Sequence, residues 1–151
     1  MKIPDRSDYL IFGGVFLLAN KMQIVGDKMV DGLSTKQWFL TRTLMDMPSD
    51  PPPTITRIAC EMDTTRQNVA KMLEKMEREG LVIIEGNESD RRSRRVHLTD
   101  LGLRRGKQVA DNSQDFLKRL FKGIGAAKLN TAGAVILKMM KNLSDMQEDI
   151  S

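Results

Sequence analysis

The sequence has few of the residues that build disulfides and metal sites. It contains one cysteine and one histidine among 151 residues. Cys60 cannot form a disulfide within the chain, which favours a reducing compartment. One histidine with one cysteine is too few for a typical zinc site. We therefore expect no metal, no other cofactor and a cytoplasmic protein. Cys60 lies near the expected core positions Ala59 and Met62, which predicts an inert buried thiol.

Long hydrophobic runs are also missing. The longest uncharged apolar stretch covers residues 9–20, which is too short to span a bilayer. The eight residues before it carry two acidic and two basic side chains, and no small-residue cleavage site follows, so a signal peptide is not indicated. We expect a buried helix over about 7–30 and no membrane partner.

Groupings typical of enzymes are not found in the sequence. There is no paired nucleophile and base, and no glycine-rich phosphate loop before a helix, so we expect no enzyme activity. Apolar residues make up 40% and charged residues 29%, which predicts one globular domain over 1–151. The net charge of +4 permits a nucleic-acid partner without requiring one.

The order of predicted elements is more informative. Ser34 and Gln37 have capping-box spacing and begin a helix that Pro48 ends. Leu33 and Trp38 stand at the two positions of a hydrophobic staple. A short helix then ends near 63, and a second helix runs from 65 to 80. Strands are expected at 81–85 and 95–98, with turn residues at 86–90. Long helices to about 122 and from about 126 complete the chain.

A short helix, a tight turn, a second helix and a hairpin are the order of a winged helix-turn-helix. The first residues of the second helix then meet base edges in the major groove. If Val69 is the centre of the buried stripe, Gln67 and Lys71 point away from it, Asn68 points to one side and Arg66 lies nearer a phosphate. The candidate recognition residues are Thr65, Arg66, Gln67, Asn68 and Lys71.

The hairpin carries a cluster of arginines. Arg91, Arg92 and Arg94 would lie at its tip, where planar guanidinium groups can pair with phosphates or enter a narrow minor groove. Alone, the cluster also fits a solvated face, and the polar helix start also fits an ordinary helix. Their order and separation favour DNA.

The chain resembles the MarR family of transcriptional regulators. The pieces that carry the resemblance are 32–38, 58–59, 65–69, 73–82, 89–95 and 98–102. The resemblance implies a mostly α fold with a small β-hairpin wing. The winged helix-turn-helix core would cover about 33–99, and dimerisation helices about 7–30 and 100–151. It adds Asp90 and Arg95 to the wing residues, with Asp90 holding the wing through an arginine of its own loop.

The resemblance also implies a function. It predicts a homodimer that binds a pseudo-palindromic operator in double-stranded DNA and acts as a repressor released by a small aromatic or phenolic ligand. The apolar patterns of the first and last helices favour the dimer independently, although the last helix could instead close a core within the chain. Trp38 would be a core residue first and a ligand-pocket wall by analogy. The ligand-binding residues stay unknown. A winged-helix nucleic-acid clamp or protein-docking module without ligand response is the alternative.

Overall fold

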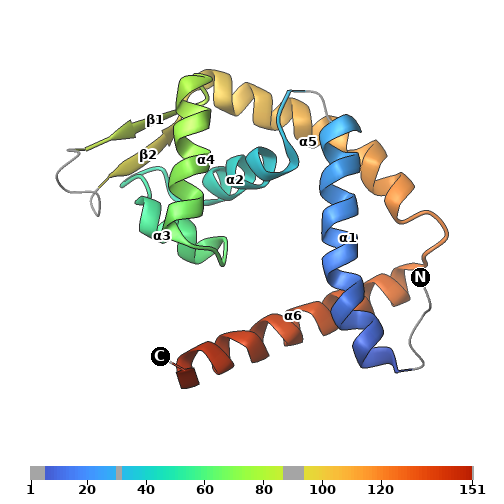
Figure 1. Cartoon of the computed structure of the whole chain (residues 1–151). Coiled ribbons are helices and arrows are strands. Elements are labelled where there is room, and N and C mark those ends of the chain that lie inside the picture. The colour runs from blue at the N-terminus through green and yellow to red at the C-terminus, as the bar shows by residue number, and fades with distance from the viewer. Residues whose placement is uncertain (1–5, 30–31, 87–93, 151) are drawn as a thin grey trace. The chain divides into compact units, whose positions relative to one another are not determined.

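The computed structural model describes residues 6–29, 32–86 and 94–150. The chain forms two compact units, Met1–Phe116 and Leu117–Ser151. The helices and strands occur in the order α1 (Ser7–Met29), α2 (Thr35–Asp46), α3 (Ile55–Glu61), α4 (Arg66–Arg78), β1 (Val82–Glu85), β2 (Arg95–Leu98), α5 (Asp100–Leu120) and α6 (Ala126–Ile150). Figure 1 shows these elements. The predicted mostly α fold with one small hairpin is confirmed, and most element ends fall within two residues of the expected positions.

Local capping chemistry explains where the helices begin. Ser34 accepts a hydrogen bond from the Gln37 backbone N–H at 3.2 Å, and the Gln37 side chain accepts one from the Ser34 N–H at 3.0 Å. This reciprocal pair is the predicted capping box at the start of α2. Thr54 and Thr65 cap α3 and α4 by one bond each, in which the side-chain oxygen accepts from the backbone N–H of Arg57 or Asn68. Each cap satisfies a backbone donor that the helix itself leaves without a partner.

The core of the first unit lies between α2, α3, α4, α5 and the hairpin. The largest fully buried side chains of this core include Leu40, Ile58, Val69, Leu73, Met76, Val82, Val96 and Val109. They come from every element of the unit except α1, so the helix-turn-helix and the hairpin share one apolar interior. This shared burial packs one face of α4 against the core that also covers the strands.

The hairpin is antiparallel and pairs Val82 with Leu98 and Glu85 with Arg95. Its base is tied to the start of α5. The Thr99 backbone N–H donates to the Leu81 carbonyl at 3.1 Å, and the Thr99 hydroxyl donates to the Gly80 carbonyl at 2.7 Å. Gly102 packs so closely here that an added Cβ would stand 2.1 Å from the Leu81 carbonyl oxygen. These contacts explain why Leu-Thr-x-x-Gly follows the wing.

Two expectations about burial were wrong. Within one chain α1 is mostly exposed rather than buried. Its aromatic residues Tyr9, Phe12 and Phe16 are each at least 60% exposed. At 23 residues α1 is also long and apolar enough to cross a membrane by length and composition, although the run of 9–20 alone is not. Cys60 is exposed on α3 rather than in the core, because Ile58 and Ala59 occupy the inward positions of that short helix.

Candidate nucleic-acid interface

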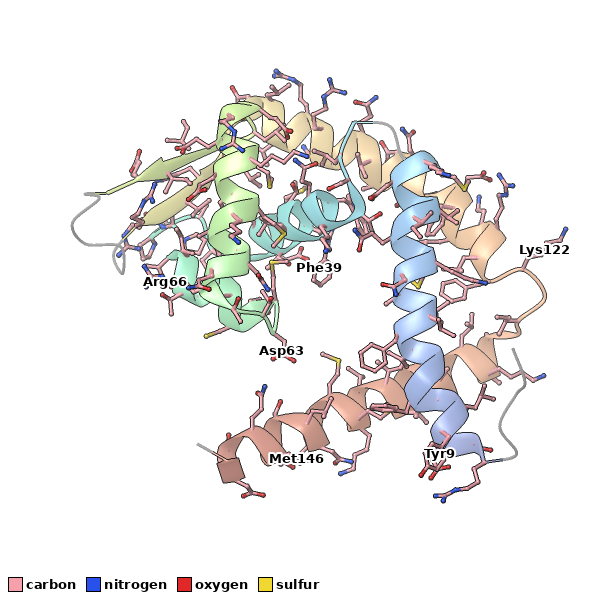
Figure 2. The ribbon with its side chains drawn as sticks, viewed as in Figure 1. Tyr9, Phe39, Asp63, Arg66, Lys122 and Met146 are labelled. Carbon is pink, nitrogen blue, oxygen red and sulfur yellow. The ribbon has the colours of Figure 1, made fainter. Side chains whose placement is uncertain are left out.

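The turn between α3 and α4 sets the start of the candidate recognition helix. Asp63 adopts a left-handed backbone conformation with φ of 47°, which aspartate tolerates better than most residues. The Thr64 N–H closes the turn by donating to the Ala59 carbonyl at 3.0 Å. Figure 2 shows Asp63 in this turn and Arg66 in the first turn of α4, at the same end of the helix. The N-terminus of α4 is therefore presented at one end of the unit.

The recognition residues predicted from the sequence lie together at this end. Gln67, Asn68 and Lys71 are exposed. Arg66 is half-buried at the edge of the apolar stripe. The Thr65 side-chain oxygen accepts a hydrogen bond from the Asn68 N–H at 3.2 Å. In this bond the Thr65 hydroxyl acts as an acceptor, so its own O–H can still donate to a group such as a phosphate oxygen.

The side chain of Asn68 has a local partner. Its Nδ2 donates to the hydroxyl of Thr64, four residues earlier in the chain, at 3.3 Å. This bond holds the amide at the helix start and orients it before any ligand is bound. An oriented amide loses less conformational entropy when it pairs with a base edge.

The wing is described at its base only. Asp90, Arg91 and Arg92 lie outside the described residues. Arg95 is exposed, and its Nη1 donates to the Pro52 carbonyl at 2.7 Å. Arg94 is half-buried, and its Nε has no hydrogen-bond partner among the described residues.

Backbone bonds complete the base of the wing. The Ile55 N–H donates to the Arg94 carbonyl at 3.3 Å, and the Val96 N–H donates to the Pro53 carbonyl at 3.0 Å. Together with the bond from Arg95 to Pro52, these bonds tie β2 to the loop before α3. The sequence alone did not indicate this tie, because nothing local to Arg95 identifies a carbonyl 43 residues away.

A second contact missed from the sequence joins α4 to the hairpin. Glu77 Oε1 accepts a hydrogen bond from the Ile84 N–H at 3.0 Å. In the sequence Glu77 looks like an ordinary exposed helix residue. Its role depends on the pairing of α4 with β1, which Figure 1 shows side by side. The bond helps to keep the hairpin and the recognition helix in one fixed arrangement.

An open pocket of about 250 Å³ lies between α2 and α5. Its lining combines one aromatic ring with cationic, anionic and apolar side chains: Trp38, Arg42, Met45, Gly106, Lys107, Ala110 and Asp111. Gly106 allows the close approach of the two helices, because a Cβ there would meet Thr41 Cγ2 at 2.7 Å. The pocket is slightly smaller and more charged than a typical site for a drug-sized ligand.

Large apolar surfaces remain uncovered on both units. On α1 they comprise Tyr9, Leu10, Ile11, Phe12, Val15, Phe16, Leu17, Leu18, Ile24, Val25 and Met29. On α6 they comprise Val135, Ile136, Leu137, Met140, Leu143 and Met146. Figure 2 labels Tyr9 and Met146 at the surfaces of these helices. Contiguous apolar surface of this extent is typical of helices that a partner covers.

The fold and the site together define a winged helix-turn-helix protein. A family model described as the MarR family matches residues 33–93. The transcriptional activatory protein BadR of Rhodopseudomonas palustris is 31% identical over 104 residues, which are 68% of this chain. The chain spans 57% of the length of that relative. Residues 33–93 therefore have the sequence pattern of the MarR family.

Solved structures of the same fold cover more of the chain. The S. aureus MepR–DNA complex is 18% identical with a TM-score of 0.71, over 89% of this chain and 95% of that one. The organohalide-sensing regulator RdhR, in a form bound to 2,4-dichlorophenol, is 15% identical with a TM-score of 0.78, over 91% and 81%. BadR is named a transcriptional activatory protein, and RdhR is named a transcriptional regulator.

Proposed function

We propose that this protein is a homodimeric transcriptional regulator that binds a pseudo-palindromic site in double-stranded DNA. The observation that carries the proposal is the N-terminal end of α4, where exposed Gln67, Asn68 and Lys71 follow the Thr65 cap. An amide can pair bidentately with adenine, and a lysine can reach guanine. The wing base beside α4 brings Arg94 and Arg95 to the same unit, and Arg91 and Arg92 are proposed to contact phosphate or the minor groove.

The dimer is proposed to form through α1 and α6. Their uncovered apolar side chains supply the surface, because most of the large apolar side chains that are exposed among the described residues lie on these two helices. A twofold axis would then present two copies of α4 to half-sites about one helical turn apart. The same covering would keep α1 out of a membrane, and we infer a cytoplasmic protein.

The regulator is proposed to act as a repressor that a small aromatic or phenolic molecule releases from DNA. The pocket between α2 and α5 is the proposed site. Trp38 offers a ring face, and Arg42 and Lys107 offer positive charge to a phenolate or carboxylate. BadR is named an activatory protein. A reporter fused to the selected operator would distinguish repression from activation by this chain.

A binding experiment tests the central proposal. The wild-type protein would be used to select a preferred duplex from a random-sequence pool, and its affinity compared with that for a scrambled duplex. Gln67→Ala should reduce the preference for the selected duplex about 5- to 100-fold and leave affinity for the scrambled duplex nearly unchanged. Arg78→Ala, at the other end of the same helix, is the matched control and should retain the preference.

The alternative is a winged-helix clamp that holds nucleic acid by charge alone. A clamp would lose affinity with rising salt as a regulator does, because phosphate neutralisation releases counterions in both cases. It would not prefer the selected duplex over the scrambled one. Equal affinity for the two duplexes at all salt concentrations would therefore reject the regulator.

A further inference from the structure

Three helix ends of the first unit meet at one place, far along α4 from its recognition residues. They are the C-terminal end of α1, the N-terminal end of α2 and the C-terminal end of α4. The side chain of Gln37 stands at the centre of this junction and is only 6% exposed. A buried primary amide with this little exposure requires partners for both its oxygen and its nitrogen.

Both atoms of the Gln37 amide have such partners. Its Oε1 accepts from the Ser34 N–H at 3.0 Å, and its Nε2 donates to Glu79 Oε2 at 2.6 Å. Glu79 is the residue at the C-terminal cap of α4. The second bond is charge-assisted and partly buried, which makes it stronger than a bond between neutral groups at the surface. One side chain thus caps α2 and holds the end of α4.

The same segment of α2 holds the end of α1. Asp27 Oδ1 accepts a hydrogen bond from the Thr35 N–H at 2.6 Å. Gly26 is buried against Thr35, and an added Cβ would stand 2.6 Å from the Thr35 hydroxyl. The first turn of α2 therefore connects α1, through Asp27 and Thr35, with α4, through Gln37 and Glu79.

We propose that Gln37 is a positioning residue that sets the direction of the recognition helix. α4 is held near its start by the turn at Asp63 and along one face by the apolar core. The bond from Gln37 to Glu79 fixes its opposite end. A helix held at both ends cannot rotate its N-terminal residues relative to the rest of the unit without breaking a charge-assisted bond. This inference rests on the proposed DNA-binding function.

An exchange of the two side chains provides a sharp test. In Gln37→Glu one carboxylate oxygen still accepts from Ser34, but the other faces the Glu79 carboxylate, and like charges repel. In the double variant Gln37→Glu with Glu79→Gln, the new amide at 79 donates to the new carboxylate at 37. The hydrogen bond between positions 37 and 79 is thus restored with donor and acceptor exchanged, and the net charge equals that of the wild type. Gln108→Glu, an exposed position on α5, controls for the added charge.

Two measurements are made on the full chain, below the unfolding temperature of every variant. The first is the affinity for the selected and the scrambled duplex. Gln37→Glu should lower the preference for the selected duplex about tenfold, while the double variant and Gln108→Glu should stay within about threefold of the wild type. The second is amide hydrogen exchange at the end of α4, where the Glu79 N–H donates to Lys75 and the Leu81 N–H to Met76. Hydrogen exchange at these amides should be about tenfold faster in Gln37→Glu than in the wild type. In the double variant its rate should return to the wild-type value.

Each outcome decides the proposal. Loss of preference in Gln37→Glu with recovery in the double variant supports it. Faster exchange without any change in preference would show that the bond stabilises the junction but does not position the helix, and would overturn the inference. An unchanged preference and unchanged exchange would overturn it as well. A wild-type protein that prefers no duplex would instead reject the proposed function, and the inference with it.

Discussion

Gly102→Ala is expected to lower the free energy of unfolding, because the added methyl group would clash with the backbone at the base of the wing. The new Cβ would stand 2.1 Å from the Leu81 carbonyl oxygen and 3.1 Å from Leu98 Cδ2. The first of these atoms belongs to the backbone, and it already accepts the Thr99 N–H, so it cannot move aside cheaply. Overpacking against such a neighbour costs up to about 3 kcal/mol. Alanine is a better helix former than glycine by about 1 kcal/mol.

The net expectation is a loss of about 2 kcal/mol. For a chain of this size, that corresponds to a melting temperature about 4–8 °C lower. Thermal unfolding followed by circular dichroism would measure the shift. Gly133→Ala on α6 is the matched control, because no described atom lies within 4 Å of its added Cβ. The control should be stabilised by about 1 kcal/mol, and its melting temperature should rise by about 2–4 °C. A Gly102→Ala protein as stable as the wild type would refute the close contact between α5 and the wing base.

Two further predictions concern charge. Replacing both Arg92 and Arg94 with alanine should weaken binding to every duplex, and the slope of log affinity against log salt concentration should become shallower by about 2. Fluorescence anisotropy would measure both quantities. An unchanged slope would show that the wing does not contact DNA. The Thr35 N–H bonded to Asp27 holds the pKa of that carboxyl below its ordinary value of 3.8, so the bond stabilises the fold above that pH and its contribution is lost as the pH falls below it. Urea unfolding should therefore show Asp27→Asn less stable than the wild type at pH 7, by a difference that shrinks as the pH falls below 3.8. A difference that does not change with pH would contradict this reasoning.

The helices and strands of the winged helix were determined by local sequence. Ser34 with Gln37 and Thr65 with Asn68 are capping partners three residues apart, so their hydrogen bonds depend on little beyond the turn that contains them. The apolar positions of α4 repeat with helical spacing, and Val69, Leu73 and Met76 are all fully buried as that spacing predicts. The exposed recognition residues follow from the same periodicity.

The burial of α1 and of Cys60 could not be read from the sequence pattern. An apolar helix such as α1 must be covered, but the sequence does not say whether its own chain or another molecule covers it. The structure of one chain leaves Phe12 and Phe16 exposed. Cys60 was likewise predicted to be buried and is exposed. Its neighbours Ala59 and Ile58 take the inward positions of a seven-residue helix, and a helix this short offers too few turns to assign a face from composition.

By itself, the sequence determined the order of the elements, their caps and the polar face at the start of α4, because each depends on residues within one or two turns. Only the tertiary structure decided which distant atoms meet. The bond from Gln37 to Glu79 joins residues 42 apart, and the bond from Arg95 to Pro52 joins residues 43 apart. No local preference encodes such a pair, since it forms only after the core has fixed the distance between the two segments.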